Sequence, residues 1–218
     1  LNPNPDRWRR QLRCLESWQR YGLPVITVNT GEELSVLDLP AGVTGAACNT
    51  TATLYDRPTQ LITSLLRVGA ATGLTTLLIN SDIEIHGPAS VLEDALSHPD
   101  RLGIGVRYNH DARKPRSSAT REPWGLDAFL FAPTMLANIP DVPLGIGKPV
   151  WDYFVPALVR RSGYKFQFID FPWLFPETHP IGWSQEEWSL GAEIMRHQIG
   201  EDLLWGTAEF RMSLNENV

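Results

Sequence analysis

Asp82 and Glu84 are the two residues whose type and spacing most directly suggest chemistry. They follow an apolar run over residues 77–79, which is typical of a buried strand. In an extended chain, residues two apart project to the same side, so both carboxylates would face one spot. Carboxylate oxygens are hard ligands that suit Mg²⁺ or Mn²⁺. The pattern therefore predicts a metal site at a strand end, and the alternative is that both acids only solvate that end.

The elements that must position this strand alternate along the chain. Apolar residues at helical spacing predict helices over residues 6–22, 58–73, 88–96, 149–163 and 184–198. Short apolar runs predict further strands over residues 24–30, 43–48, 102–108, 126–131 and 164–169. This alternation is typical of βαβ units, so we expect an α/β fold with a mostly parallel sheet flanked by helices.

One basic and polar segment, residues 109–123, interrupts the alternation. It shows neither helical nor strand periodicity, which predicts a loop. Such a loop is either a flap over an active site or ordinary surface.

The composition limits the kinds of partner. With 218 residues, of which 43% are hydrophobic, the chain is expected to form one domain over residues 1–218. A net charge of −6 does not favour binding of nucleic acid, and no apolar run is long enough for a transmembrane segment. Two cysteines favour a reducing compartment, so we expect a cytoplasmic protein. Because the chain begins at Leu1, a first strand could be missing from it.

The order of elements, with an acidic motif after a hydrophobic strand, resembles the GT-A fold of nucleotide-sugar glycosyltransferases, in the nucleotide-diphospho-sugar transferase superfamily. The likeness covers most of the chain. That family marks its metal site with Asp-x-Asp, and the best register here places Asn80 and Asp82 on the motif, with Asn80 replacing the first acid. The resemblance implies that Asp82 binds the metal directly and that Asn80 contacts the ribose or a metal-bound water. In the other register, Asp82 and Glu84 are the two acids.

The resemblance also implies a further ligand from a C-terminal loop, and His179 is the matching residue. A neutral imidazole among oxygen ligands favours Mn²⁺ over Ca²⁺. The alternative is that His179 is an ordinary surface histidine.

Two residues are candidates for the chemical step, and a third is a candidate for binding a phosphate. Asp127 interrupts an apolar strand and would either bind sugar hydroxyls or cap a turn. Asp152 lies in the first turn of an expected helix, where the resemblance implies a general base for an acceptor hydroxyl and the alternative is stabilisation of the helix dipole. Lys148, before the same helix, would meet a phosphate or be a solvated surface lysine.

The nucleotide is expected over the ends of the first strands. Asn29 and Glu33 follow one of these strands, Arg57 precedes a helix and could reach the base or a phosphate, and Trp183 lies in a loop where it could stack on a sugar ring.

Together these residues predict a glycosyltransferase that uses Mn²⁺ or Mg²⁺ to move a sugar from a nucleoside diphosphate sugar to a hydroxyl acceptor. Two alternatives stay open. Asn80 in the motif favours a non-catalytic protein of the same fold that binds nucleotide or sugar. The other alternative is a nucleotidyltransferase or a nucleotide-sugar hydrolase on a related sheet, although no glycine-rich, basic phosphate loop follows the first strand.

Overall fold

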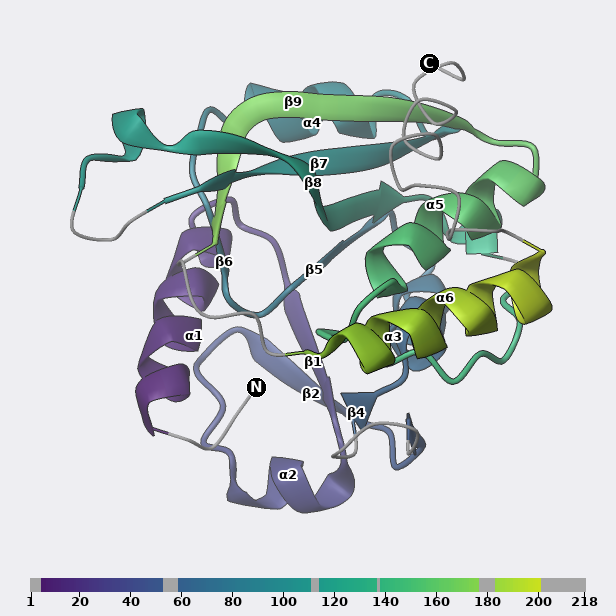
Figure 1. Cartoon of the computed structure of the whole chain (residues 1–218). Coiled ribbons are helices and arrows are strands. Elements are labelled where there is room, and N and C mark those ends of the chain that lie inside the picture. The colour runs from purple at the N-terminus through teal and green to yellow at the C-terminus, as the bar shows by residue number, and fades with distance from the viewer. Residues whose placement is uncertain (1–4, 53–58, 111–113, 137, 177–182, 201–218) are drawn as a thin grey trace.

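The structure is a computed structural model that describes residues 5–52, 59–110, 114–136, 138–176 and 183–200 (Figure 1). Its centre is a sheet of five strands in the order β5 (Thr76–Ile79), β8 (Thr120–Phe131), β7 (Arg101–Asn109), β9 (Lys165–Pro176) and β6 (Ile83–Ile85). No helix in the described ranges is long and apolar enough to cross a membrane.

The α/β class is confirmed, but the expected mostly parallel sheet is wrong. Within the described sheet, β7 and β9 are parallel, whereas the pairs β5–β8, β7–β8 and β6–β9 are antiparallel. The reason lies in the connections, because β7 and β8 follow each other closely enough to pair as a hairpin. Alternating apolar runs predict strands without fixing their directions.

The strand expected at residues 77–79, with an extended chain continuing through Glu84, is instead two strands separated by a turn. The amide of Ile83 donates to the carbonyl of Asn80 (3.3 Å), which closes a turn over residues 80–83. β5 and β6 then lie at opposite edges of the sheet. Asp82 is in this turn rather than in an extended strand, so the argument that places it on one side with Glu84 does not hold.

The two ends of the basic segment expected to be a loop extend the strands of the hairpin, at Asn109 and at residues 120–123. Asn109 pairs with Thr120 and Tyr108 with Arg121, and the short helix η1 (Arg116–Ser118) lies between the two strands. These strand ends consist mostly of polar residues and show no hydrophobic alternation, so the sequence pattern predicted no strand here.

Smaller elements lie beside this sheet. β1 (Val25–Asn29) and β2 (Val43–Ala47) form a parallel pair, and α2 (Gly31–Val36) connects them. β3 (Thr51–Ala52) pairs with β4 (Thr59–Gln60), so α3 (Ile62–Ala71) begins later than the helix expected from residue 58.

The two faces of the sheet bury two hydrophobic clusters. On β8, Phe129 and Phe131 pack with α3, α5 (Trp151–Arg161) and α6 (Gln185–Ile199), while the alternating Ala128 and Leu130 pack with α1 (Pro5–Gln19) and α4 (Ser90–Leu96). Figure 1 shows α5 and α6 side by side, with α1 beside β6. The short helix η2 (Pro133–Leu136) contributes to the first cluster.

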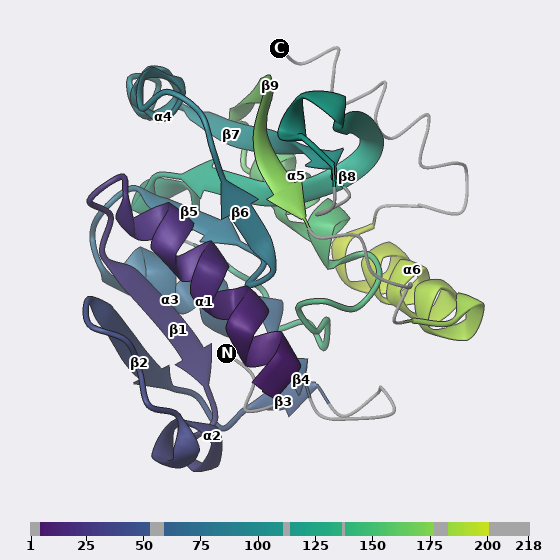
Figure 2. The ribbon, with the colours of Figure 1, turned by 90° about the vertical axis from the view of Figure 1, so that its left-hand side faces the viewer.

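Helix α1 lies beside β6 (Figure 2), and two hydrogen bonds fix it there. The indole of Trp18 donates to the carbonyl of Ile83 (2.8 Å), and the amide of Ile85 donates to the hydroxyl of Ser17 (2.9 Å). These bonds use backbone groups of a short edge strand, which would otherwise lack partners on that side.

Candidate active site

Asp127 owes its position to a β-bulge in β8. Gly105 on β7 pairs with Ala128, but the next residue, Val106, pairs with Leu126, so Asp127 is one extra residue in the ladder. A bulge of this kind re-aims a side chain relative to the regular alternation. On the other side of β8, Ala128 pairs with Ile79, the last residue of β5. The bulge therefore brings Asp127 next to the turn that begins at Asn80.

The buried carboxyl of Asp127 has a partner at each oxygen. Asn80 donates from Nδ2 to Oδ1 (3.1 Å), and Arg107 donates from Nη1 to Oδ2 (3.1 Å). Burial raises the pKa of Asp127, and the negative charge of Asp82 adds to the effect, while Arg107 and Asn80 oppose it. Asn80 and Arg107 thus fix the carboxyl of Asp127 in place, and its proton affinity depends on Arg107.

Gly125 makes room for Arg107. A Cβ at position 125 would lie 2.4 Å from Nε and 2.6 Å from Cδ of Arg107, which is closer than atoms can approach. Any side chain here would displace the guanidinium that contacts Asp127. The absence of a side chain at Gly125 is therefore part of the site.

Asp152 brings a second carboxyl to the same region from the first turn of α5. Burial, together with the nearby charge of Asp127, raises the pKa of Asp152 to about 8, although the backbone amides of Asp152 and Tyr153 and the charge of Arg107 oppose the shift. The residue keeps part of its surface accessible, although its carboxyl is closely surrounded by protein. Two interacting acids in one site favour a state in which they share one proton.

The helix start that carries Asp152 is strained. Val150, the residue that caps α5, has φ 77° and ψ −15°, a left-handed conformation that a β-branched residue rarely adopts. Among the described residues it is the one non-glycine residue with positive φ. Strain of this kind persists where surrounding contacts determine the backbone, and it is concentrated at functional sites.

Contacts with α6 fix the backbone at the start of α5. Lys148 is buried (3% exposed) and its Nζ donates to Oε1 of Glu187, whose Oε2 accepts from the amide of Ser184 in the capping box of α6. Gly191 of α6 packs so closely that a Cβ there would lie 3.0 Å from the carbonyl oxygen of Pro149. The interpretation of Lys148 as a solvated surface residue is wrong, and its role as a phosphate ligand stays a prediction that this ion pair does not favour.

Asp82, the predicted metal ligand, lies half-buried in the turn beside Asp127. Ser81 in the same turn accepts a hydrogen bond from Nε2 of Gln11 (2.8 Å), which fixes the turn to α1. Carboxylate and amide oxygens from Asp82 and Asn80 have the donor chemistry that Mg²⁺ or Mn²⁺ requires. Within the described ranges no three His, Cys, Asp or Glu side chains gather as a metal cage. His179 lies outside those ranges.

Glu84, the acid of the alternative register, contacts cationic groups instead. Its Oε2 accepts from Nη2 of Arg116 (2.6 Å) and lies 2.6 Å from Nε2 of His86, and Oε1 lies 3.6 Å from Nε of Arg13. Asn80, the first position of the other register, instead contacts Asp127, and the choice between the two registers stays a prediction.

The residues expected to bind the nucleotide lie in different environments in the structure. Asn29 is buried at the end of β1, where its Nδ2 donates to Oε2 of Glu33 (3.3 Å). Glu33 also accepts from the amide of Thr30 (2.9 Å) as part of the capping box of α2. Trp183, just before the cap of α6, is 39% exposed, and Arg57 lies outside the described residues. Their binding roles stay predictions.

Sequence reasoning missed Arg107, although a signal was present. Arg107 interrupts a strand of glycine and apolar residues, as Asp127 does in the neighbouring strand. Two opposite charges that interrupt adjacent buried strands predict an ion pair, since an unpaired charge there would be costly.

Comparison of the chain with models of known protein families and with curated proteins gave no match. The geometry itself offers two carboxyls that can hold or take a proton, a guanidinium that holds one of them, and oxygen ligands in the adjoining turn.

Proposed function

We propose that the chain is a metal-dependent glycosyltransferase that moves a sugar from a nucleoside diphosphate sugar to a hydroxyl acceptor. The observation that carries the proposal is the Asp127–Asp152 pair, in which Asp152 has a pKa of about 8 beside the turn that bears Asn80 and Asp82. Deprotonation of an acceptor hydroxyl needs a base whose pKa lies near the working pH. An ordinary surface aspartate is a much weaker base.

In this proposal Asp152 is the general base. Its carboxylate accepts the proton of the acceptor hydroxyl while the acceptor oxygen bonds to the anomeric carbon, and the bond from that carbon to the diphosphate oxygen breaks. The acceptor proton then resides on Asp152 and the negative charge on the departing diphosphate. The strained start of α5, fixed by Lys148 and Glu187, holds the carboxyl in place.

Asp127 acts through its charge and its hydrogen bonds. Arg107 and Asn80 stabilise the ionised form of Asp127, and that charge raises the proton affinity of Asp152. Two carboxyls whose surroundings differ are a common way to divide acid and base roles. A sugar hydroxyl that donates to Asp127 is the second contact we propose for this residue.

Asp82, with Asn80 and His179, would hold Mn²⁺ or Mg²⁺ at the turn after β5. When bound, the cation supplies electrostatic stabilisation of the charge that develops on the departing diphosphate. Asp82 would contribute an anionic oxygen and Asn80 a neutral one, and diphosphate oxygens and water would complete the shell.

Calorimetry with Mn²⁺ and a panel of nucleoside diphosphate sugars, followed by analysis of products with and without hydroxyl acceptors, tests the proposal. Metal-linked binding with acceptor-dependent release of nucleoside diphosphate supports it. Binding without turnover for any acceptor would leave a non-catalytic binder, and cleavage within the diphosphate would indicate a hydrolase or nucleotidyltransferase. Absence of metal-linked binding across the panel would contradict the assignment.

A further inference from the structure

A pocket lies on the side of the molecule where α1 meets the hairpin of β7 and β8. This basic pocket has a volume of about 760 Å³ and is lined by three arginines, Arg13, Arg20 and Arg116, together with His86, Glu84 and Phe175. None of the acids of the candidate active site, Asp82, Asp127 or Asp152, lines it. It is a different place in the fold, and the proposed reaction does not use it.

The arginines reach the basic pocket from two separate elements. Arg13 lies in α1 and Arg20 follows its last residue, while Arg116 lies in η1 at the tip of the hairpin. Glu84 fixes two of them, because its carboxylate contacts both Arg13 and Arg116. A planar guanidinium has five N–H donors, and the bond from Arg116 to Glu84 uses Nη2. Glu84 therefore orients the guanidinium of Arg116 through Nη2, which leaves the other edge of that group to face a ligand.

Among the three arginines of the basic pocket, Arg20 is the one without an ion pair to a described carboxylate, whereas Arg13 and Arg116 contact Glu84. Nη2 of Arg20 lies 3.4 Å from Nδ1 of His86, and no described Asp or Glu is within ion-pairing distance of it. The pocket holds three arginines against two acids, Glu16 and Glu84, in a chain whose net charge is −6. A local excess of positive charge on an acidic protein favours an anionic ligand.

The shape of the pocket narrows the class of anion. Guanidinium groups that approach from different elements suit a tetrahedral oxyanion with several acceptor oxygens better than a planar carboxylate, for which one guanidinium fork suffices. The volume exceeds what inorganic phosphate needs and lies in the range of sites for small organic ligands. Phe175 adds an apolar surface, and the rings of His86 and His110 pack edge-on against it with centroids 5.8 and 6.1 Å away.

From these contacts we propose that the basic pocket binds a phosphate monoester of a small hydroxylated molecule. The phosphoryl oxygens accept hydrogen bonds from Arg20, Arg13 and Arg116, and the organic part lies against Phe175. This site requires no metal, and it stands whether or not the chain transfers sugars.

Calorimetric titration with a hexose 1-phosphate, in the presence of a metal chelator and without nucleotide, tests the proposal. Inorganic phosphate, a hexuronate and the neutral hexose are the comparison ligands. The hexose phosphate is expected to bind most tightly, inorganic phosphate more weakly, and the hexuronate and the neutral hexose least. Lack of saturable binding by the hexose phosphate overturns the site, and a hexuronate that binds as tightly overturns its phosphate assignment.

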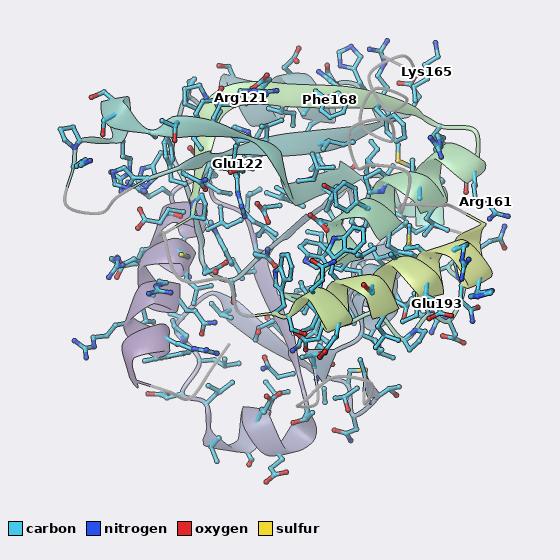
Figure 3. The ribbon with its side chains drawn as sticks, in the orientation of Figure 1. Arg121, Glu122, Arg161, Lys165, Phe168 and Glu193 are labelled. Carbon is cyan, nitrogen blue, oxygen red and sulfur yellow. The ribbon has the colours of Figure 1, made fainter. Side chains whose placement is uncertain are left out.

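Substitutions locate the binding. Arg20→Gln changes an exposed side chain and is expected to weaken hexose phosphate binding about 10-fold, because a charged hydrogen-bond donor is lost. Arg121→Gln is the matched control, since Arg121 lies on the same hairpin (Figure 3) but pairs with Asp170 (2.7 Å) and does not line the pocket. Equal weakening by both variants, or no effect of Arg20→Gln, contradicts the proposed location.

Two further variants test the charge of the basic pocket and its separation from the candidate active site. Glu16→Gln removes a negative charge from the pocket and is expected to tighten binding about 2-fold. Asp82→Asn is expected to leave chelator-resistant binding unchanged. If Asp82→Asn abolishes it, the phosphate binds at the candidate active site and the basic pocket is not the site. That outcome is independent of any failure to find turnover.

Discussion

Asp152 and Glu84 are two partly buried acids whose pKa values shift in opposite directions. Burial by itself would raise the pKa of either carboxyl. At Glu84, hydrogen bonds from His86 and Arg116, together with their charges, more than offset burial and lower the pKa. At Asp152 the neighbouring side chain is another acid, Asp127, which adds to the effect of burial. At Glu84 the basic neighbours reverse the effect of burial, whereas at Asp152 deeper burial and an acidic neighbour act in the same direction.

This difference separates an anchoring acid from one that can exchange a proton. Glu84 stays ionised and fixes two arginines at the basic pocket, so proton transfer from it is unfavourable. Asp152 gains or loses its proton near neutral pH, which is what a general base requires. The two acids thus suit different roles, Glu84 as an anchor for arginines and Asp152 as a group that exchanges a proton.

Replacement of Asp152 should have the largest effect. Asp152→Asn keeps the size of the side chain but cannot accept a proton, so kcat should fall by roughly 10²-fold or more while donor affinity stays close to wild type. Steady-state kinetics with calorimetry of donor binding measures both quantities. If Asp152 only stabilises the helix start, kcat is near normal and the free energy of unfolding falls by about 0.5–1 kcal/mol at most.

Replacement of Asp82 should separate the two registers. Asp82→Asn is expected to weaken Mn²⁺-dependent donor binding at least about 10-fold, because an anionic metal ligand is lost. Glu84→Gln is the matched control at the neighbouring acid and should have a smaller effect, since Glu84 is engaged with Arg13, His86 and Arg116. Equal losses would restore the register that uses both acids.

A methyl group at Gly125 should disturb the active site through Arg107. Gly125→Ala places a Cβ where the Arg107 side chain lies, so the guanidinium must leave Asp127, and we expect turnover to fall about 10-fold. A double-mutant cycle with Arg107→Gln checks the route. If the substitution acts through Arg107, the double variant is little worse than Arg107→Gln alone, whereas additive losses would show that Gly125 matters for another reason.

The pH dependence should reveal the coupling between Asp127 and Asp152. If ionised Asp152 is the base, kcat/KM rises with pH along a limb centred near pH 8. Asp127→Asn removes the negative charge that raises the pKa of Asp152, so the limb should move to lower pH in that variant. A limb at the same pH in both proteins would mean that Asp127 does not set the proton affinity of the group observed.

The sequence predicted the parts of this arrangement that depend on local pattern. The strand before Asn80, the helix that begins near Asp152 and the capping box at Ser184 follow from apolar spacing and polar caps, which are local properties. Strand direction, the turn at Asp82 and the bulge at Asp127 depend on pairing between distant segments. The contact from Arg107 to Asp127 joins residues 20 apart, and single-sequence periodicity carries no information about it.

The smallest effects should appear in stability, with opposite pH slopes at the two acids. The pKa of Glu84 is lowered from 4.5, so its ionisation stabilises the folded state above that pH, and the contribution is lost as pH falls through the folded-state pKa. Glu84→Gln should therefore lower the free energy of unfolding at pH 7, by at most about 1 kcal/mol, and the difference from wild type should shrink in acid.

The pKa of Asp152 is raised from 3.8 to about 8, so the folded state holds a proton that the unfolded chain releases, and stability falls as pH rises across that window. Asp152→Asn lacks this slope and should gain stability relative to wild type between pH 5 and pH 8. Urea unfolding of the three proteins at several pH values measures both slopes, and slopes of the same sign would mean that Asp152 and Glu84 do not differ as their neighbours imply.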